Sequence, residues 1–141
     1  MELNFIDTNV WLYRLFDDQR IEAIERERKR NIAISITEKS NLIISTQVIN
    51  ELSVNLIKKA KFDESQIKAV LQSLYNRCQV LPFELTILES ASDLRSQYSL
   101  SFWDSLIVAS ALAGGANVLY SEDIQDGLIV LKQLNIINPF K

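Results

Sequence analysis

Apolar residues follow two different spacings along the chain. Short apolar runs bounded by polar residues are typical of buried strands, and apolar residues three or four apart are typical of amphipathic helices. The run Leu42 to Ser45 (LIIS) is of the first kind, and Val48, Ile49, Leu52 and Leu56, which follow it, are of the second. This order of strand and then helix repeats the order at the start of the chain.

The same criteria assign the remaining elements. Strands are expected at Glu2–Ile6, Leu42–Ser45, Gln79–Pro82 and Asn117–Tyr120, with a weaker edge strand at Leu128–Leu131. Besides the helix after LIIS, helices are expected at Thr8–Asp17, Arg20–Lys39, Asp63–Arg77, Thr86–Tyr98 and Trp103–Ala113. Short apolar strands that alternate with helices favour a parallel sheet covered on both faces. The predicted fold class is therefore α/β.

Length and composition predict one compact domain over residues 1–141. The chain has 141 residues, of which 48% are hydrophobic, enough to bury a core. Its apolar runs are shorter than the roughly 18 residues needed to span a bilayer, so no membrane protein is expected. The single cysteine, Cys78, cannot form an internal disulfide, and no signal peptide is recognisable. We therefore expect a cytoplasmic location.

Two features of composition limit the chemistry. With 15 basic and 18 acidic residues the net charge is −3, so any nucleic acid would have to be bound through local basic patches or bound cations. The absence of histidine excludes Ser-His-Asp and Cys-His pairs, His-ligated zinc and the paired histidines of metal-free ribonucleases. Catalysis would have to use carboxylates, hydroxyls, amides or cations.

Four acids fall where a parallel sheet places its ligands, beyond the carboxyl ends of the strands. Asp7 follows the first strand, Glu51 lies about a turn into the helix after LIIS, and Asp123 lies just past the NVLY strand. Asp104 opens the helix that leads into NVLY, and that helix should run antiparallel to the strands. All four acids are therefore predicted at one edge of the sheet.

Such a group of carboxylates needs a partner of opposite charge, because like charges close together resist ionising. Mg²⁺ or Mn²⁺ takes hard oxygen ligands, and a pair of such ions can activate water and stabilise the leaving oxygen in phosphodiester cleavage. The pattern therefore predicts that Asp7, Glu51, Asp104 and Asp123 are both metal ligands and catalytic residues.

Each acid also has a simpler interpretation. Asp7 could cap the first helix, and Glu51 could be an ordinary exposed helix residue. Asp104 lies three residues after Ser101, the spacing of a capping box, and Asp123 could belong to a polar turn. Only the joint placement of the four acids favours a site.

Four blocks of sequence resemble the PIN-domain family, especially the toxin nucleases of bacterial VapC-type toxin-antitoxin pairs. The blocks are FIDTNVWLY (Phe5–Tyr13), STQVINEL (Ser45–Leu52), SFWDSLIVASAL (Ser101–Leu112) and LYSEDIQDG (Leu119–Gly127). They occur in the family's order, and each contains one of the four acids. The resemblance implies an α/β/α sandwich and Mg²⁺- or Mn²⁺-dependent endoribonuclease activity, with the four acids on the family's motif positions.

The resemblance also implies roles for neighbouring residues. Thr8 and Ser121 would orient the acids through their hydroxyls, Asn9 occupies the usual amide position of the first block, and Asp126 would assist as a fifth acid. Family toxins are held inactive by a small antitoxin protein and often form dimers. The resemblance thus implies an RNA substrate, an antitoxin partner and a homodimer, and it gives no role to the region Asp18–Asn41.

Three interpretations stay open at this point. The densest basic clusters, Arg26 to Arg30 and Lys58 to Lys61, either contact RNA or form solvated surface. The aromatic residues Trp11, Tyr13 and Trp103 either stack on a base or pack in the core. The main alternatives to a nuclease are a catalytically inert PIN-like module that binds RNA or protein, and an aspartyl-phosphate protein, which would usually carry an Asp where Asn9 stands.

Overall fold

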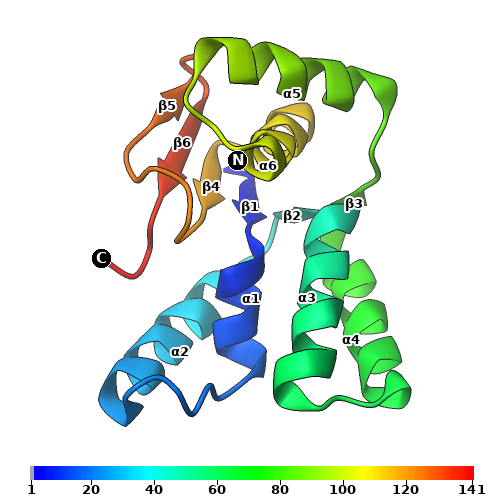
Figure 1. Cartoon of the computed structure of the whole chain (residues 1–141), viewed down its shortest axis with the longest axis vertical. Helices are drawn as coiled ribbons and strands as arrows, with labels where there is room; N and C mark the ends of the chain where they lie inside the picture. The colour runs from blue at the N-terminus through cyan, green and yellow to red at the C-terminus, as the bar shows by residue number, and fades with distance from the viewer. Residues whose placement is uncertain (1) are drawn as a thin grey trace.

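The computed structural model describes residues 2–141. Its centre is a sheet in the order β3-β2-β1-β4-β6-β5 (Figure 1). The strands are β1 (Asn4–Ile6), β2 (Leu42–Ser45), β3 (Cys78–Leu81), β4 (Val118–Tyr120), β5 (Ile129–Val130) and β6 (Leu134–Ile137). Every pairing is parallel except that of β5 with β6. The predicted α/β class with a mostly parallel sheet is confirmed.

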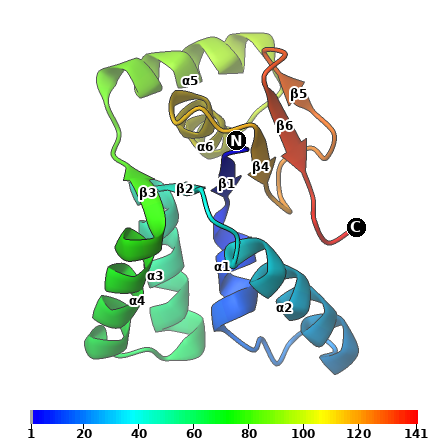
Figure 2. The ribbon, with the colours of Figure 1, turned by 180° about the vertical axis from the view of Figure 1, so that it is seen from behind.

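Six helices accompany these strands in residues 2–141. They are α1 (Thr8–Leu15), α2 (Ala23–Thr37), α3 (Thr46–Ala60), α4 (Glu64–Arg77), α5 (Leu85–Gln97) and α6 (Phe102–Ala113). Figures 1 and 2 show α1 with α2, and α3 with α4, as two helical hairpins that project beyond the end of β1, while α5 and α6 lie toward the other end of the molecule. The carboxyl edge of the sheet therefore lies at the base of the two hairpins.

The core is continuous between the sheet and α6. All residues of β1 and β2 are buried, and so is every residue from Ser105 to Ala111 of α6. Gly114, at the end of α6, is needed for close packing, because a Cβ there would lie 2.9 Å from a methyl of Leu81 and 3.1 Å from Ile43. The absence of a side chain at Gly114 thus lets the end of α6 contact β2 and β3.

The C-terminal hairpin corrects one prediction. The apolar pattern predicted a single edge strand at Leu128–Leu131, whereas the structure has β5 at Ile129–Val130 and a second strand, β6, that the pattern did not predict. The turn between them holds Leu131 and Lys132 at φ of 50° and 56°. Positive φ is usually supplied by Gly or Asn, so this turn carries no recognisable sequence signal.

Helix ends differ from the prediction by a few residues. The first helix ends at Leu15 and the second begins at Ala23, so a longer loop separates them than the pattern indicated. The side chain of Glu22 accepts hydrogen bonds from the N–H groups of Ile24 and Glu25, which fixes the start of α2 after that loop.

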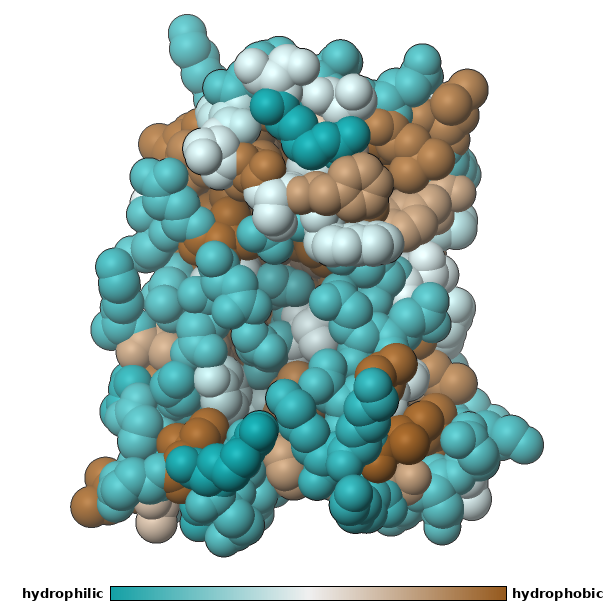
Figure 3. Space-filling model, viewed as in Figure 1, coloured by the Kyte–Doolittle hydropathy of each residue, from teal (hydrophilic) through white to brown (hydrophobic). Residues whose placement is uncertain are grey.

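The surface differs between the two ends of the molecule. On the face in Figure 3, hydrophilic residues cover most of the lower half, over the helical hairpins, and hydrophobic residues gather in the upper half. Exposed apolar side chains of α5 and the β5–β6 hairpin include Leu85, Leu88, Ile129 and Leu131. No helix within residues 2–141 is long and apolar enough to cross a membrane.

Candidate active site

Asp7 lies at the end of β1, in the middle of the sheet. Its N–H donates to the carbonyl of Tyr120 in β4 at 3.0 Å, which continues the strand pairing into the site. Oδ1 accepts from the N–H of Thr8 at 2.7 Å, and Oδ2 accepts from the Ser121 hydroxyl at 2.8 Å. Asp7 is only 7% exposed. Its carboxylate therefore has a fixed orientation, and Asp7 caps α1 while lying close enough to Glu51 and Asp123 to be affected by their charges.

Burial raises the pKa of Asp7 to about 6, because the charged carboxylate loses its hydration. The hydrogen bonds from Thr8 and Ser121 lower this pKa, while the charges of Glu51 and Asp123 raise it further. A carboxylate that is buried near two others has an unusually unfavourable charge in the absence of a cation.

Asp123 follows β4 and is exposed at the rim of the same site. The Asn9 side-chain N–H donates to its Oδ2 at 2.7 Å. Ser121 accepts hydrogen bonds from the N–H groups of Asp123 and Ile124, both at 3.2 Å, while donating to Asp7. Ser121 therefore links the loop of Asp123 to Asp7. Desolvation, Glu122 and Asp104 all raise the pKa of Asp123.

Glu51 faces the other acids from α3. Its pKa is raised, first by desolvation and then by the charges of Asp104 and Asp123, while the side chains of Gln47 and Thr8 act in the opposite direction. Thr8 donates to Asp7 through its backbone N–H, whereas its hydroxyl makes no hydrogen bond among the described residues, so the predicted role of the Thr8 hydroxyl in orienting an acid has no supporting bond.

Asp104 lies in the first turn of α6. The Ser101 hydroxyl oxygen accepts from the N–H of Asp104 at 3.1 Å, as expected of a helix cap. Within the described part of the chain, no bond returns from the Asp104 carboxylate to the Ser101 N–H, so the reciprocal capping box is not formed. The Asp104 charge instead acts on Glu51 and Asp123.

The structure therefore brings the four predicted acids into one electrostatic group at the carboxyl edge of the sheet. We call Asp7, Glu51, Asp104 and Asp123 the carboxylate group. None of the salt bridges within residues 2–141 involves any of them. In the same residues, no three acidic, cysteine or histidine side chains are close enough together to enclose a metal ion. The charges of these acids act on one another and raise the pKa values of Asp7, Glu51 and Asp123.

A second cluster adjoins the loop of Asp123. Glu122 accepts from the Tyr13 hydroxyl at 2.5 Å and from Lys29 at 2.6 Å, and Lys29 also lies 4.8 Å from the centre of the Tyr13 ring. The Tyr13 ring packs edge-on against Phe140 at 4.9 Å. This Tyr13–Lys29–Glu122 cluster joins α1 and α2 to the loop that carries Asp123. Glu122 was not among the predicted site residues, and its only signal in the sequence is its position beside Asp123.

Asp126, the predicted fifth acid, has contacts elsewhere. Its Oδ1 accepts from the N–H of Asn138 at 2.7 Å, and its Oδ2 lies 3.6 Å from the Lys141 ammonium. These contacts hold the C-terminal segment after β6. A catalytic role for Asp126 stays a prediction without a supporting contact.

The two basic clusters also differ. In α2, Arg28 pairs with Glu25, Lys29 with Glu122 and Arg30 with Asp17, so these charges have partners within the protein. No salt bridge within residues 2–141 involves Lys58, Lys59 or Lys61. Lys59 lines a small hollow of about 110 Å³ together with Asn9. The lysines at the end of α3 are thus the better candidates for contacting an anion.

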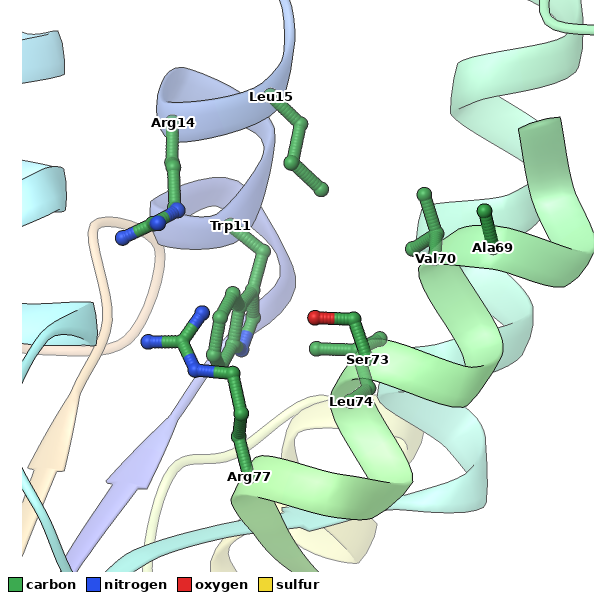
Figure 4. Close-up of a pocket in the computed structure, with 8 residues that line it drawn as sticks. All are labelled: Trp11, Arg14, Leu15, Ala69, Val70, Ser73, Leu74 and Arg77. Atoms are coloured by element: carbon green, nitrogen blue, oxygen red, sulfur yellow. The ribbon is translucent and has the colours of Figure 1, made fainter.

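The aromatic side chains resolve into two kinds. Trp11 is 1% exposed and belongs to the core, whereas Trp103 is 61% exposed beside Asp104. Figure 4 shows Trp11 and the Arg77 guanidinium at a pocket of about 250 Å³ between α1 and α4. That pocket is lined by Trp11, Arg14, Leu15, Ala69, Val70, Ser73, Leu74 and Arg77. It includes no member of the carboxylate group, so it is separate from the candidate active site.

Fold and site together define an α/β domain whose parallel strands carry a carboxylate group at their carboxyl edge. A PIN domain family model matches residues 5–126. The chain belongs to the PIN domain family.

Solved structures show the same fold at low sequence identity. A chain of a toxin-antitoxin complex from Klebsiella pneumoniae is 20% identical, with a TM-score of 0.68 over 96% of this chain and 97% of that one. VapC20 from Mycobacterium tuberculosis, a toxin that cleaves the sarcin-ricin loop, is 17% identical, with a TM-score of 0.62 over 85% and 89%. A chain of VapBC-1 from nontypeable Haemophilus influenzae is 19% identical, with a TM-score of 0.61 over 99% of both chains. No curated protein matched the sequence.

Proposed function

We propose that this protein is a metal-dependent endoribonuclease, and that it is the toxin of a toxin-antitoxin pair. The observation that carries the proposal is the carboxylate group, four acids from four separate segments that meet at the carboxyl edge of the sheet. The pKa values of Asp7, Glu51 and Asp123 are raised partly by the neighbouring acids. Neighbouring carboxylates with shifted pKa values and no cationic side chain paired to them are typical of functional sites.

The donor set fits Mg²⁺ or Mn²⁺, which prefer hard oxygen ligands. Such ions, when bound, lower the pKa of water and stabilise charge on the attacking and leaving oxygens of a phosphodiester. Asp7, Glu51, Asp104 and Asp123 would hold the ions. Bound cations would also offset the mutual repulsion that raises the carboxylate pKa values, so the site would gain most from ions at neutral pH.

The protein's own residues have separable roles in this reaction. Thr8 and Ser121 fix both oxygens of Asp7, so the deepest ligand is oriented before substrate arrives. Asn9 holds Asp123 at the rim. The lysines at the end of α3 supply positive charge for the flanking phosphates, which is needed in a protein whose net charge is −3.

The toxin assignment is supported by the solved structures with this fold. Of the three described above, two come from a toxin-antitoxin complex or from VapBC proteins, and the third is a toxin that cleaves the sarcin-ricin loop. We therefore propose RNA as the substrate and a small antitoxin protein as the partner, which would be expected to cover the carboxylate group or prevent access to it.

The direct test is cleavage of purified cellular RNA by protein freed of any antitoxin. We expect cleavage with Mg²⁺ or Mn²⁺, none with excess chelator, and none from Asp7→Asn with either ion. Cleavage that continues in excess chelator would contradict the metal-dependent mechanism.

The same experiment separates the enzyme from an inert PIN-like module. A module would bind RNA in a gel-shift or anisotropy measurement but produce no new 5′ or 3′ ends with any divalent cation. Retention of all four motif acids, each placed at the same edge, favours the enzyme, because a binding module has no need for carboxylates that repel RNA phosphates.

A further inference from the structure

A hollow of about 390 Å³ lies beside the carboxylate group. It is lined by Gln47, Asn50 and Glu51 of α3, Phe83 of the loop after β3, and Trp103 of α6. Glu51 belongs to the carboxylate group, and Trp103 directly precedes Asp104. A ligand in this hollow would therefore lie next to the atoms that the carboxylates act on. We call it the Trp103 hollow.

Its aromatic side chains are unusually exposed. Trp103 is 61% exposed and Phe83 is 37% exposed, although large aromatic side chains are mostly buried in folded proteins. The Trp103 ring is supported edge-to-face by Phe102 at 5.2 Å, and the Arg95 guanidinium lies 4.6 Å from the centre of the Phe102 ring. Trp103 is thus braced in place while much of its surface is open to a planar ligand.

The polar lining favours a ligand without charge. Asn50 contributes an amide that can donate and accept, and Gln47 contributes its carbonyl oxygen, because its side-chain N–H donates to the Trp103 carbonyl at 3.4 Å; the lining contains no lysine or arginine. Gln47 is 7% exposed, and its carbonyl oxygen has no hydrogen-bond partner within the described residues. A phosphate would be repelled by Glu51 and would find no cation here. A flat ring with donors and acceptors at its edge matches this lining.

We propose that the Trp103 hollow binds one unpaired nucleobase of the RNA, stacked on Trp103, beside the phosphate that is cut. This inference rests on the proposed function and adds a requirement to it. A base in a duplex has both faces covered by its neighbours, so the substrate must be single-stranded at this position. The amides of Gln47 and Asn50 would select among bases through hydrogen bonds at the base edge.

A second copy of the chain is a less suitable occupant. A symmetric dimer places the same patch of each copy against the other, so an interface centred on this hollow would bring two copies of Glu51 and its neighbouring acids together. That arrangement would add to the repulsion already present in the carboxylate group.

The test is binding of single-stranded RNA by the full-length protein in Ca²⁺, a cation that carboxylates also ligate. Fluorescently labelled tetranucleotides, each with a single type of base, are titrated and their anisotropy is measured. We expect Trp103→Ala to weaken binding by about tenfold to a hundredfold, the range typical of losing one stacked base, and Trp103→Phe to restore most of it. A paired hairpin of the same composition should bind weakly to both.

Tryptophan emission gives an independent signal, since the chain has two tryptophans and Trp11 is buried. Unpaired tetranucleotides should quench the exposed Trp103, and this quenching should disappear in Trp103→Ala. The matched control is Tyr75→Ala, which removes an aromatic side chain of similar exposure from α4, a helix that contributes no residue to the carboxylate group. Circular dichroism confirms that each variant folds.

Each outcome separates this inference from the proposed function. If Trp103→Ala binds and cleaves RNA like the wild type, the base-binding hollow is wrong and the nuclease stands. If Trp103 is quenched and required for binding but no RNA is cut, the hollow stands and the nuclease is wrong. If Trp103→Ala only converts a dimer to a monomer in sedimentation, with RNA binding unchanged, the hollow is an interface between copies and our inference is overturned.

Discussion

Two helices of this protein, α4 and α6, begin with a polar N-cap residue and a second polar residue three positions later, but the two pairs form different hydrogen bonds. At the start of α4, Asp63 accepts from the Gln66 N–H, and the Gln66 side chain accepts from the Asp63 N–H, both at 2.8 Å. At the start of α6, the Ser101 hydroxyl caps the Asp104 N–H, but no reciprocal bond from the Asp104 side chain is formed in the described chain.

The difference shows what distinguishes a structural polar residue from a functional one. The side-chain oxygen of Gln66 accepts a hydrogen bond at the start of its own helix. The Asp104 carboxylate makes no such bond among the described residues, and its charge raises the pKa values of Glu51 and Asp123. A charge held in place without a partner in the protein is the feature expected of a group that awaits a ligand.

The largest expected effect comes from Asp104→Asn, which keeps the shape of the side chain and removes its charge. We expect the single-turnover rate of RNA cleavage in Mg²⁺ to fall by about two orders of magnitude or more, the loss typical of removing one electrostatic catalytic group. Asp63→Asn is the matched control at α4 and should keep the wild-type rate. If Asp104→Asn stays active and is merely less stable, Asp104 is only part of a helix cap.

The second prediction concerns Asp7 and pH. Because its pKa is about 6 in the folded state against 3.8 normally, the folded state binds the Asp7 proton more tightly than the unfolded state does. The free energy of unfolding should therefore decrease as pH rises from about 4 to 6, by about 3 kcal/mol at most for this group. Asp7→Asn removes this pH-dependent contribution to the free energy of unfolding, but it also removes the hydrogen bond that Ser121 donates, which contributes about 1 kcal/mol.

We accordingly expect metal-free Asp7→Asn to be about 1–2 kcal/mol more stable than the wild type at pH 7, and this advantage to disappear toward pH 4. Urea denaturation in chelator at several pH values measures the difference. Mg²⁺ should stabilise the wild type and reduce the advantage of the variant. A stability difference that does not vary with pH would show that the Asp7 charge carries no penalty.

A smaller effect is expected from the cap of α4. Asp63→Ala should reduce the free energy of unfolding by about 1 kcal/mol, the usual cost of losing an N-cap, and should leave the cleavage rate unchanged. Ser101→Ala should cost a similar amount of stability and also slow cleavage, since Ser101 fixes the backbone of Asp104. Equal cleavage rates in Asp63→Ala and Ser101→Ala would show that the start of α6 is no more important for cleavage than the start of α4.

The sequence predicted the regions whose local apolar pattern fits only one kind of element. Short apolar strands such as LIIS and the uniformly apolar α6 have few alternatives, so their positions were correct. The strand at Leu134–Ile137 was missed because the turn before it uses Leu131 and Lys132 where positive φ usually requires Gly or Asn. Local pattern cannot reveal a turn whose unusual conformation is imposed by pairing between strands.

The candidate site divides in the same way. The edge position of Asp7 and Asp123 followed from strand order alone, since parallel strands end together. The partners of Glu122 could not be predicted, because Tyr13 and Lys29 are far from it in sequence and carry no common motif. The sequence likewise could not distinguish the buried Trp11 from the exposed Trp103, since both stand among apolar residues.

The smallest expected effect tests whether the Tyr13–Lys29–Glu122 cluster tunes Asp123. Glu122 raises the pKa of Asp123, after desolvation, and the Lys29 ammonium lies 2.6 Å from the Glu122 carboxylate. Lys29→Met leaves Glu122 uncompensated, so the pKa of Asp123 should rise and the acidic limb of the pH–rate profile should move to higher pH. Glu122→Gln removes the repulsion and should move that limb to lower pH.

The opposite directions are the discriminating feature, because general loosening of the loop would shift both variants the same way or lower the rate equally at every pH. Rates at the pH optimum should change by less than about tenfold, since a partly buried hydrogen bond contributes about 0.5–1.5 kcal/mol. Arg30→Met is the matched control: Arg30 lies on the same helix as Lys29, its pair with Asp17 is exposed, and the variant should leave the profile in place. If Lys29→Met and Arg30→Met give superimposable pH–rate profiles, the Tyr13–Lys29–Glu122 cluster stabilises the fold without influencing Asp123. Glu122, an acid with partners inside the protein, would then have no effect on the neighbouring acid Asp123, which is predicted to bind a metal ion.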